Sequence, residues 1–455
     1  MKKSILLSIA VMCLCMNVTA QEDADSKYIR NSLYMMKLDM VPDNAEYAHA
    51  FEVMNNTFNG IDFAKRYERY NDFSLGERHI DWATIPAVTK EEIAAIGKES
   101  QKDLMIKRQL LGMGVKVDPI SEYEYAARIL KYFNENKFGN QLVAKWHVAA
   151  GADTKNIAAW DDQLSVIMDL GMKGLSEEAR ANAKASENLI QMCGNSENKL
   201  IGTTYVCVND YRLITAKEKS AVPIAVAEIT LQFLPSIAQL AGSAAVSIAK
   251  KAAQKTKGYF VKTNAYLFKL DWDQTKFDAF YSDFWGNPGS FYEKADYQLK
   301  YVGKSSKAAG AGMTMNADKV DELTARGALR ATDAAFAALQ RDYEEFRPMS
   351  SLHVIDGKLG AYIGKKESIK AGDKFNVFIP EEDKEGNVVW KQVGTIKVDK
   401  NGVWDNSEGA GVQIEGAAED GEDNDDDANS ALTCTVFAEK PSKKFGEGCM
   451  IRLAK

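Results

Sequence analysis

Two runs rich in β-branched and aromatic residues, LIGTTYVCVNDYRL at 200–213 and YFVKTNAYLFKLDW at 259–272, decide the fold of the larger part of the chain. Successive side chains of a β-strand point to opposite faces of its sheet. Tyr205, Cys207 and Tyr211 therefore share one face of the first run, and the second run alternates in the same way. We expect the two runs to be neighbouring strands of one sheet.

Helical patterns surround these strands. Residues 121–139 begin with a capping Ser, carry Glu three residues later and end in Gly, which is typical of one helix. Residues 141–148 then have the pattern of a strand, and a long helix is expected from about Val320 until Pro348 stops it. This alternation of helices and strands predicts a mixed α/β domain over residues 21–346.

The sequence changes in character beyond residue 347, where six short β-like runs follow one another. The turn signals between them are Asp356-Gly357, Gly372-Asp373, Gly386-Asn387 and Asn401-Gly402. About a hundred residues with short strands is the size of a small closed barrel, in which closure removes exposed strand edges. We therefore predict an α+β protein with a small β-barrel over residues 347–455 and a domain boundary at 346–350.

The N-terminal residues have the organisation of a secretory signal. Lys2 and Lys3 form a positive start, Ile5–Cys15 an apolar run, and Val18-Thr19-Ala20 a small-residue cleavage site. The apolar run is shorter than the about 20 residues that a bilayer span needs. We expect residues 1–20 to be removed and the protein to be exported. A retained anchor and a lipid-modified Cys are the alternatives.

An apolar insertion lies between the two strand runs. Residues 221–249 are almost free of charge and rich in Ala, Ile, Val and Leu. Their length suits a bilayer span, but Glu228 lies inside the segment, and Pro223 and Pro235 interrupt it. We favour an Ala-rich helical hairpin, buried in the core or against a second copy of the chain. The alternatives are a contact with the outer membrane and a mobile loop.

A second insertion is acidic. Residues 415–427 contain eight carboxylates and no basic residue. Alternate Asp residues from Asp423 have the spacing that begins a calcium-binding EF-hand loop, but Ala428 replaces the required Gly and Cys434 the final Glu. We expect a solvated acidic loop rather than a metal site, with weak divalent-ion binding as the alternative.

Four cysteines remain after removal of the signal: Cys193, Cys207, Cys434 and Cys449. An even number suits an oxidising compartment. Pairing of Cys193 with Cys207 and of Cys434 with Cys449 is the simplest disulfide pattern. Four buried free thiols are an equal alternative.

Charge and missing motifs limit the classes of function. With 57 Lys and Arg against 64 Asp and Glu, the chain lacks the basic surplus that nucleic-acid binding needs. The four histidines have no metal-binding spacing, and no nucleophile elbow is present. Gly303-Lys304-Ser305 imitates a phosphate-binding loop without its first glycine, so we expect a flexible linker at 303–314. No catalytic residue, metal or cofactor is predicted.

The best candidate for a binding site lies where the second strand run ends. Asp271, Asp273 and Asp283 are interleaved there with Trp272 and Trp285. Aromatic faces beside carboxylates suit the stacking of sugar rings. Core packing of a strand that leads into an amphipathic helix explains the same pattern, and both interpretations stay open.

The C-terminal region resembles a known module in three stretches, GAYIGKKESIKAGDKFNVF at 360–378, VGTIKV at 393–398 and GEGCMIRL at 446–453. They are similar to the SH3-like barrel that closes flagellar assembly lipoprotein-type proteins. Glu447 and Gly448 stand where that family has a Gly-Asp pair, and the acidic loop is an added insertion. The resemblance implies an SH3-like barrel at the end of the chain.

Two further resemblances concern the rest of the chain. The order of elements in residues 27–346 resembles the α/β domain of curli-secretion and Tol-Pal-associated envelope proteins. Segments 128–143 and 259–285 resemble secreted proteins of unknown function from Bacteroides-type bacteria. These resemblances imply a cell-envelope protein whose domains bind or assemble rather than catalyse.

Together these patterns predict an exported protein of a Gram-negative envelope, in the periplasm or at the outer membrane, that acts as an assembly, scaffold or binding component without catalysis. Its expected partners are other envelope proteins or a second copy of itself, with a membrane contact through residues 221–249 as an option. Nucleic acid is not an expected partner. The alternative is a glycan-binding or glycan-hydrolysing protein that uses the aromatic and carboxylate cluster at 271–285.

Overall fold

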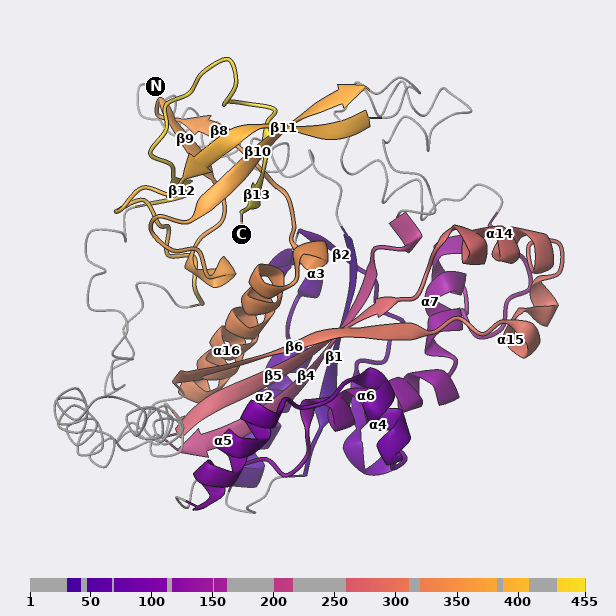
Figure 1. Cartoon of the computed structure of the whole chain (residues 1–455). Coiled ribbons are helices and arrows are strands. Elements are labelled where there is room, and N and C mark those ends of the chain that lie inside the picture. The colour runs from indigo at the N-terminus through magenta and orange to yellow at the C-terminus, as the bar shows by residue number, and fades with distance from the viewer. Residues whose placement is uncertain are drawn as a thin grey trace, which may run out of the picture.

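The structure is a computed structural model, shown in Figure 1. The predicted signal peptide at 1–20, the apolar insertion at 221–249, the acidic loop at 415–427 and Cys193 lie outside the residues that it describes. The described residues are 31–41, 47–67, 69–112, 117–149, 151–161, 200–215, 259–310, 320–382, 388–408 and 432–454.

A six-stranded mixed sheet forms the centre of the larger part, the sheet domain, which comprises the described residues up to 346. Its strands are β1 (Asn31–Asp39), β2 (Tyr70–Asp72), β3 (His79–Asp81), β4 (Thr204–Thr215), β5 (Tyr259–Leu270) and β6 (Leu299–Gly310). Their order is β2-β1-β4-β5-β6, and β3 also pairs with β1. β1 is parallel to β2, β3 and β4, whereas β5 is antiparallel to β4 and β6. The predicted pairing of the two strand runs is confirmed.

Helices cover both faces of this sheet (Figure 1). The helices described in this domain are α2 (Ala48–Asn59), α3 (Phe63–Arg66), α4 (Lys90–Ile96), α5 (Gln101–Gly112), α6 (Glu122–Glu135), α7 (Phe138–His147), α14 (Gln274–Asp283), α15 (Phe291–Lys294) and α16 (Val320–Asp342). Because side chains alternate along β4, Val206 belongs to one core with α6 and α7, and Tyr205 to a second core with α2 and α16. The sheet is therefore buried on both faces.

The strand predicted at 141–148 is wrong, because these residues belong to α7 and the loop that follows it. α6 ends at Glu135, and Lys137, with a φ of 50°, turns the chain so that α7 begins at Phe138. Nearly every side chain of α7 is buried. A helix enclosed on all sides carries apolar residues around its whole circumference and loses the 3.6-residue periodicity that identifies a helix.

The flexible linker predicted at 303–314 is also wrong over its described part, which belongs to β6. This strand pairs with β5 from Leu299 to Gly310. Its Lys, Ser, Ala and Gly residues have weak strand propensity, so the backbone hydrogen bonds to β5 hold it extended. Gly303 is required where β6 passes Tyr343, since a Cβ at this position would lie 1.9 Å from the Tyr343 ring.

The C-terminal module, the described residues from 347 to 454, contains two small antiparallel sheets around one core. Its strands are β7 (Ser350–Ser351), β8 (His353–Ile355), β9 (Lys358–Ala361), β10 (Lys374–Glu382), β11 (Val388–Lys397), β12 (Thr435–Val436) and β13 (Met450–Leu453). One sheet has the order β11-β10-β13-β7 and the other β12-β9-β8. Leu352, Val377 and Ile451 are fully buried in the shared core.

The closed barrel expected here is not formed by the described strands. An isolated bridge between Val398 and Phe437 connects the two sheets. β7 and β12 are two residues long, which leaves too few backbone pairs to close a ring. The α+β class is confirmed: a mixed sheet is followed by small antiparallel sheets.

Within the described ranges, no helix combines the length and the apolar character needed to cross a membrane.

Candidate functional site

One edge of the large sheet brings together segments that are far apart in the sequence. β1 runs parallel to β4 and β5 runs antiparallel to it, so the starts of β1 and β4 lie beside the end of β5. Ser32 is paired with Thr204, and Tyr205 with Lys269. The chain continues from β5 into Trp272, which lies at the same edge and faces the C-terminal module.

A cleft of about 530 Å³ lies between this edge and the C-terminal module. Trp272 contributes to its sheet-domain side, and Trp390 of β11 to its module side. This volume falls in the range of small-molecule binding sites. The charged lining residues are the cations Arg69, Lys269, Arg347 and Arg452 and the carboxylates Asp273, Glu344 and Glu345.

Both tryptophans are positioned by aromatic or apolar neighbours and stay partly exposed. The Trp272 ring centroid is 5.4 Å from that of Tyr297, and Phe277 meets the indole edge-on at 6.4 Å. Trp390 packs against Phe378 and neighbouring methionines of the module. Each indole thus has one part fixed by protein contacts and another part at the cleft.

Two of the four arginines and lysines in the cleft, Arg347 and Arg452, form no ion pair with any residue that the structure describes. Arg347 uses its guanidinium to donate to backbone carbonyls, from Nε to Gln340 at 3.2 Å and from Nη2 to Arg341 at 2.6 Å. Arg452 lies over the Phe378 ring, 5.3 Å from its centroid. In the described part of the chain neither side chain forms an ion pair, so both can bind an anionic group of a ligand.

The other two cations of the cleft are already paired. Lys269 donates from Nζ to Glu345 at 2.6 Å. Arg69 forms an ion pair with Glu367 at 3.1 Å, donates from Nε to Ser350 Oγ at 3.1 Å, and also donates to the backbone carbonyl of Tyr362. Arg69 therefore ties the sheet domain to the C-terminal module and sets the position of one cleft wall.

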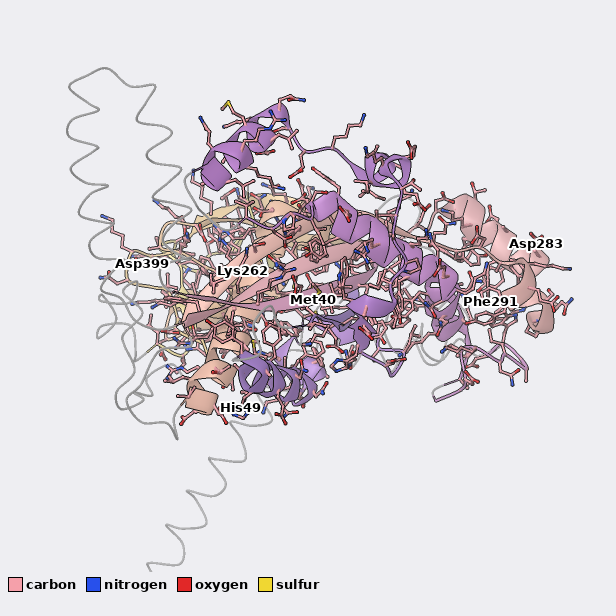
Figure 2. All side chains as sticks on the ribbon, turned by 90° about the horizontal axis from the view of Figure 1, so that it is seen from below. Met40, His49, Lys262, Asp283, Phe291 and Asp399 are labelled. Atoms are coloured by element: carbon pink, nitrogen blue, oxygen red, sulfur yellow. The ribbon has the colours of Figure 1, made fainter. Side chains whose placement is uncertain are left out.

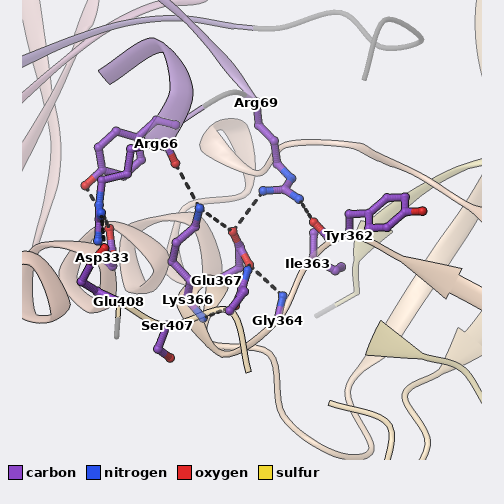
Figure 3. Close-up of polar contacts among 12 residues, drawn as sticks. Arg66, Arg69, Asp333, Tyr362, Ile363, Gly364, Lys366, Glu367, Ser407 and Glu408 are labelled. Atoms are coloured by element: carbon purple, nitrogen blue, oxygen red, sulfur yellow. Dashed lines mark hydrogen bonds and ion pairs between the residues drawn. The ribbon is translucent and has the colours of Figure 1, made fainter. Parts of the chain in front are cut away.

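A network of polar contacts fixes the two modules relative to each other (Figure 3). Arg66 of α3 pairs with Asp333 of α16 and reaches Glu408 of the module at 2.8 Å. Lys366 of the module donates from Nζ to the Arg66 carbonyl at 3.1 Å. Burial alone would raise the pKa of the Glu367 carboxyl, but the charges of Arg69 and Lys366 lower it. The cleft is therefore pre-formed by ion pairs that remain charged at neutral pH.

The structure divides the residues that the sequence singled out for binding. Trp272 and Asp273 line the cleft. Asp273 also caps α14 by accepting from the Lys276 backbone N–H at 2.9 Å. Asp271 pairs with Lys276 at 2.5 Å and with Lys300 at 2.7 Å. Burial alone would raise the pKa of Asp271, and hydrogen bonds from these two lysines lower it.

Trp285 and Asp283 lie at the other end of α14, away from the cleft. Trp285 packs at 5.0 Å from Tyr281 and stacks on Trp160 at 6.4 Å between ring centroids. Asp283 is exposed and accepts from Ser282 Oγ at 2.6 Å. In Figure 2 it lies at the opposite end of the molecule from Asp399 of the C-terminal module. The predicted cluster is therefore two separate places, of which one contributes to the cleft.

The cysteines contribute no disulfide among the described residues. Cys207, Cys434 and Cys449 are buried free thiols, and Cys193 lies outside the described residues. Burial raises the pKa of Cys207 to about 12. The described ranges also contain no group of three or more His, Cys, Asp or Glu side chains placed to hold a metal ion.

Sequence reasoning missed most of the cleft. Trp390, Arg347 and Arg452 come from a β-strand, a linker and the last strand, and no local motif joins them. Only the aromatic and charged character of each residue could have drawn attention to them.

Comparisons with known proteins add no family: no protein-family model matches the chain, and no curated protein matches it.

Proposed function

We propose that this protein is an exported binding protein of the cell envelope and that it holds an acidic glycan in the cleft between its two modules. The observation that carries the proposal is that two tryptophans, one from each module, line the cleft together with Arg347 and Arg452, which form no ion pair within the described ranges. Indole faces pack well on the apolar faces of sugar rings. Guanidinium groups bind carboxylates through strong, charge-assisted hydrogen bonds.

The two arginines without an ion pair support an acidic rather than a neutral glycan. Lys269 is paired with Glu345, and Arg69 with Glu367. Among the other charged residues of the lining, Arg347 and Arg452 stand with the carboxylates Asp273 and Glu344. The two guanidinium groups are in no ion pair within the described residues, so they can take the carboxylate of a sugar that stacks on Trp390. A uronic acid has a ring for the indole and a carboxylate for the guanidinium.

We also propose that the C-terminal module is an SH3-like barrel that is open between its two sheets. The sheets share one core, and the bridge between Val398 and Phe437 joins them. Gly372 adopts a φ of 81° in the turn before β10, at the Gly-Asp position of the resemblance. A role in assembly through residues 221–249 remains a prediction of the sequence.

The test is isothermal titration calorimetry of residues 21–455 with oligogalacturonate, an acidic oligosaccharide. Trp390→Ala should weaken binding by about tenfold, the equivalent of one stacking contact. Arg452→Gln should weaken it by about tenfold or more because a charge-assisted hydrogen bond is lost. Lys391→Gln is the matched control: this exposed residue neighbours Trp390 on the strand and pairs with Glu381 outside the cleft.

The outcomes separate clearly. Binding that depends on Trp390 and Arg452 but not on Lys391, and that weakens with added salt, supports the acidic-glycan cleft. Maltoheptaose, which is neutral, should bind more weakly and should not respond to Arg452→Gln. Failure of the native chain to bind oligogalacturonate, or equal losses in all three variants, overturns the proposal. Thermal unfolding of each variant shows whether the fold is intact.

A further inference from the structure

A row of polar side chains crosses the middle of the large sheet on the face that α6 covers. Asp210 of β4 is paired with Asn264 of β5, and Asn264 with Ser306 of β6. Ser306 Oγ donates to Asn264 Oδ1 at 2.6 Å, and Asn264 Nδ2 donates to Asp210 Oδ2 at 2.9 Å. The Asp210 carboxylate is fully buried, and its Oδ1 has no hydrogen-bond partner among the described residues. Hydrogen bonds thus fix the row, and Asp210 Oδ1 is an acceptor without a donor among the described residues.

Two lysines on β5 and β6 flank this row of polar side chains. Lys262 of β5 is paired across the strands with Arg212, and Lys304 of β6 with Tyr266. The Lys304 ammonium lies 5.3 Å from the Tyr266 ring centroid. The Tyr266 hydroxyl is buried and has no hydrogen-bond partner among the described residues. Neither lysine forms an ion pair within the described ranges. Figure 2 labels Lys262 on the ribbon of the sheet.

The carboxylates near these lysines are paired with Arg212 or lie beyond ion-pair distance of the lysines. Arg212 takes the nearest carboxylates, from Nε to Asp210 at 2.9 Å and from Nη1 to Asp118 at 3.0 Å. Burial lowers the pKa of Lys262, and Arg212 lowers it further, while Asp210 and Asp118 oppose this shift. Burial also lowers the pKa of Lys304, and Lys262 adds to this effect, while Glu122, Asp210 and Asp118 oppose it. An anion between the two ammonium groups would relieve their mutual repulsion.

The cluster is separate from the cleft described above. Asp210 lies midway along β4, where it is paired with Leu38 near the carboxyl end of β1. The cleft lies at the edge where β1 and β4 begin and β5 ends, so the two sites are independent.

We propose that this cluster, the β4–β6 site (Asp210, Lys262, Asn264, Tyr266 and Lys304), binds a small phosphate ester that also carries a hydroxyl group. The phosphate lies between the ammonium groups of Lys262 and Lys304, and the ligand hydroxyl donates to Asp210 Oδ1. Lysine binds phosphate as a point charge without a fixed geometry, which fits two flexible side chains from the neighbouring strands β5 and β6. Polyol and sugar phosphates have this combination of groups.

The test is isothermal titration calorimetry of residues 21–455 with glycerol 3-phosphate. Lys304→Met and Lys262→Met should each reduce affinity about tenfold or more, because each removes one charge-assisted contact. Both variants keep the aliphatic stem, so folding should be preserved. Lys307→Met is the matched control, since Lys307 is exposed on the opposite face of β6. Its affinity should stay within about twofold of the native value.

A second measurement does not depend on any variant. Acetic anhydride should modify Lys262 and Lys304 in the native protein, and glycerol 3-phosphate should slow this reaction at both positions but not at Lys307. Peptide mass spectrometry gives the three rates. No binding by the native chain, equal losses in all three variants, or labelling at Lys262 and Lys304 that the ligand leaves unchanged overturns the proposal. Glycerol, which lacks the phosphate, should give no heat and no protection.

Discussion

Arg66 and Asp333 form a bidentate ion pair in which Nε donates to Oδ1 at 3.0 Å and Nη2 donates to Oδ2 at 2.5 Å. The Asp333 side chain is 5% exposed and that of Arg66 16%. Asp333 also accepts a hydrogen bond from the Tyr67 hydroxyl at 3.2 Å. The pair joins α3 to α16 beneath the C-terminal module, and Glu408 of the module takes the remaining nitrogen of Arg66. Arg66 thus links Glu408 of the C-terminal module to the buried Asp333 of the sheet domain.

Replacing Asp333 by Ala should lower the free energy of unfolding by about 3–5 kcal/mol, since it leaves the buried Arg66 charge without its main partner. Urea unfolding at pH 7 measures the change. The control is Glu381→Ala, which breaks the exposed pair with Lys391 and should cost at most about 1 kcal/mol. Equal losses in the two variants would show that the Arg66 pair is no more important than a surface contact.

The strands β4 and β5 could be predicted from the sequence because β-branched and aromatic residues alternate over their whole length. α7 could not, since buried side chains on all its faces remove the periodic signal. β6 could not, because its composition is that of a linker and only its pairing with β5 makes it a strand. Local pattern therefore succeeded where a strand has strong intrinsic preference and failed where tertiary contacts decide.

The cleft shows the same division. Trp272 and Asp273 were candidates because they are close together in the sequence. Trp390 meets them only after the C-terminal module has docked, and that docking depends on long-range ion pairs such as the one between Arg69 and Glu367. Such contacts have no signature in a single sequence. Trp285, in contrast, was close in sequence and is separate in space.

Replacing Gly139 by Ala should destabilise the protein although Ala is the better helix former. A Cβ at this position of α7 would lie 2.0 Å from the carbonyl oxygen of Tyr297, so the helix must move away from the segment that leads into β6. Overpacking of this kind costs about 1–3 kcal/mol. Urea unfolding tests the prediction, with Gly286→Ala as control, because nothing lies within 4 Å of a Cβ there. A stabilised Gly139→Ala variant would contradict this close approach.

The buried thiols should be unreactive in the folded protein. Burial raises the pKa of Cys207 to about 12, so at pH 8 its thiolate fraction is about three orders of magnitude below that of a free cysteine. Iodoacetamide at pH 8 should label Cys207, Cys434 and Cys449 only after urea is added, as peptide mass spectrometry can show. Recovery of a linked Cys434–Cys449 peptide without reductant would contradict the free thiols. It would instead support the disulfide between Cys434 and Cys449 that the sequence left open.

His147 should make stability depend on pH over a defined window. Its ring is stacked on Phe280 at 4.2 Å between centroids, and burial lowers its pKa from 6.5 to about 3. Between these values the unfolded chain binds a proton that the folded chain does not, so the stability that neutral His147 contributes is present above about pH 6.5 and is lost as the pH falls toward 3. The folded protein should therefore lose about 2 kcal/mol between pH 7 and pH 5 from this residue alone.

The variant His147→Phe isolates this contribution, because phenylalanine keeps the stacking on Phe280 and cannot take a proton. All carboxylates titrate alike in both proteins, so the difference between their urea unfolding curves at pH 7 and pH 5 belongs to His147. The native protein should lose about 2 kcal/mol more than the variant over this interval. Parallel losses in the two proteins would mean that the His147 ring also binds a proton in the folded protein, and that water reaches this ring.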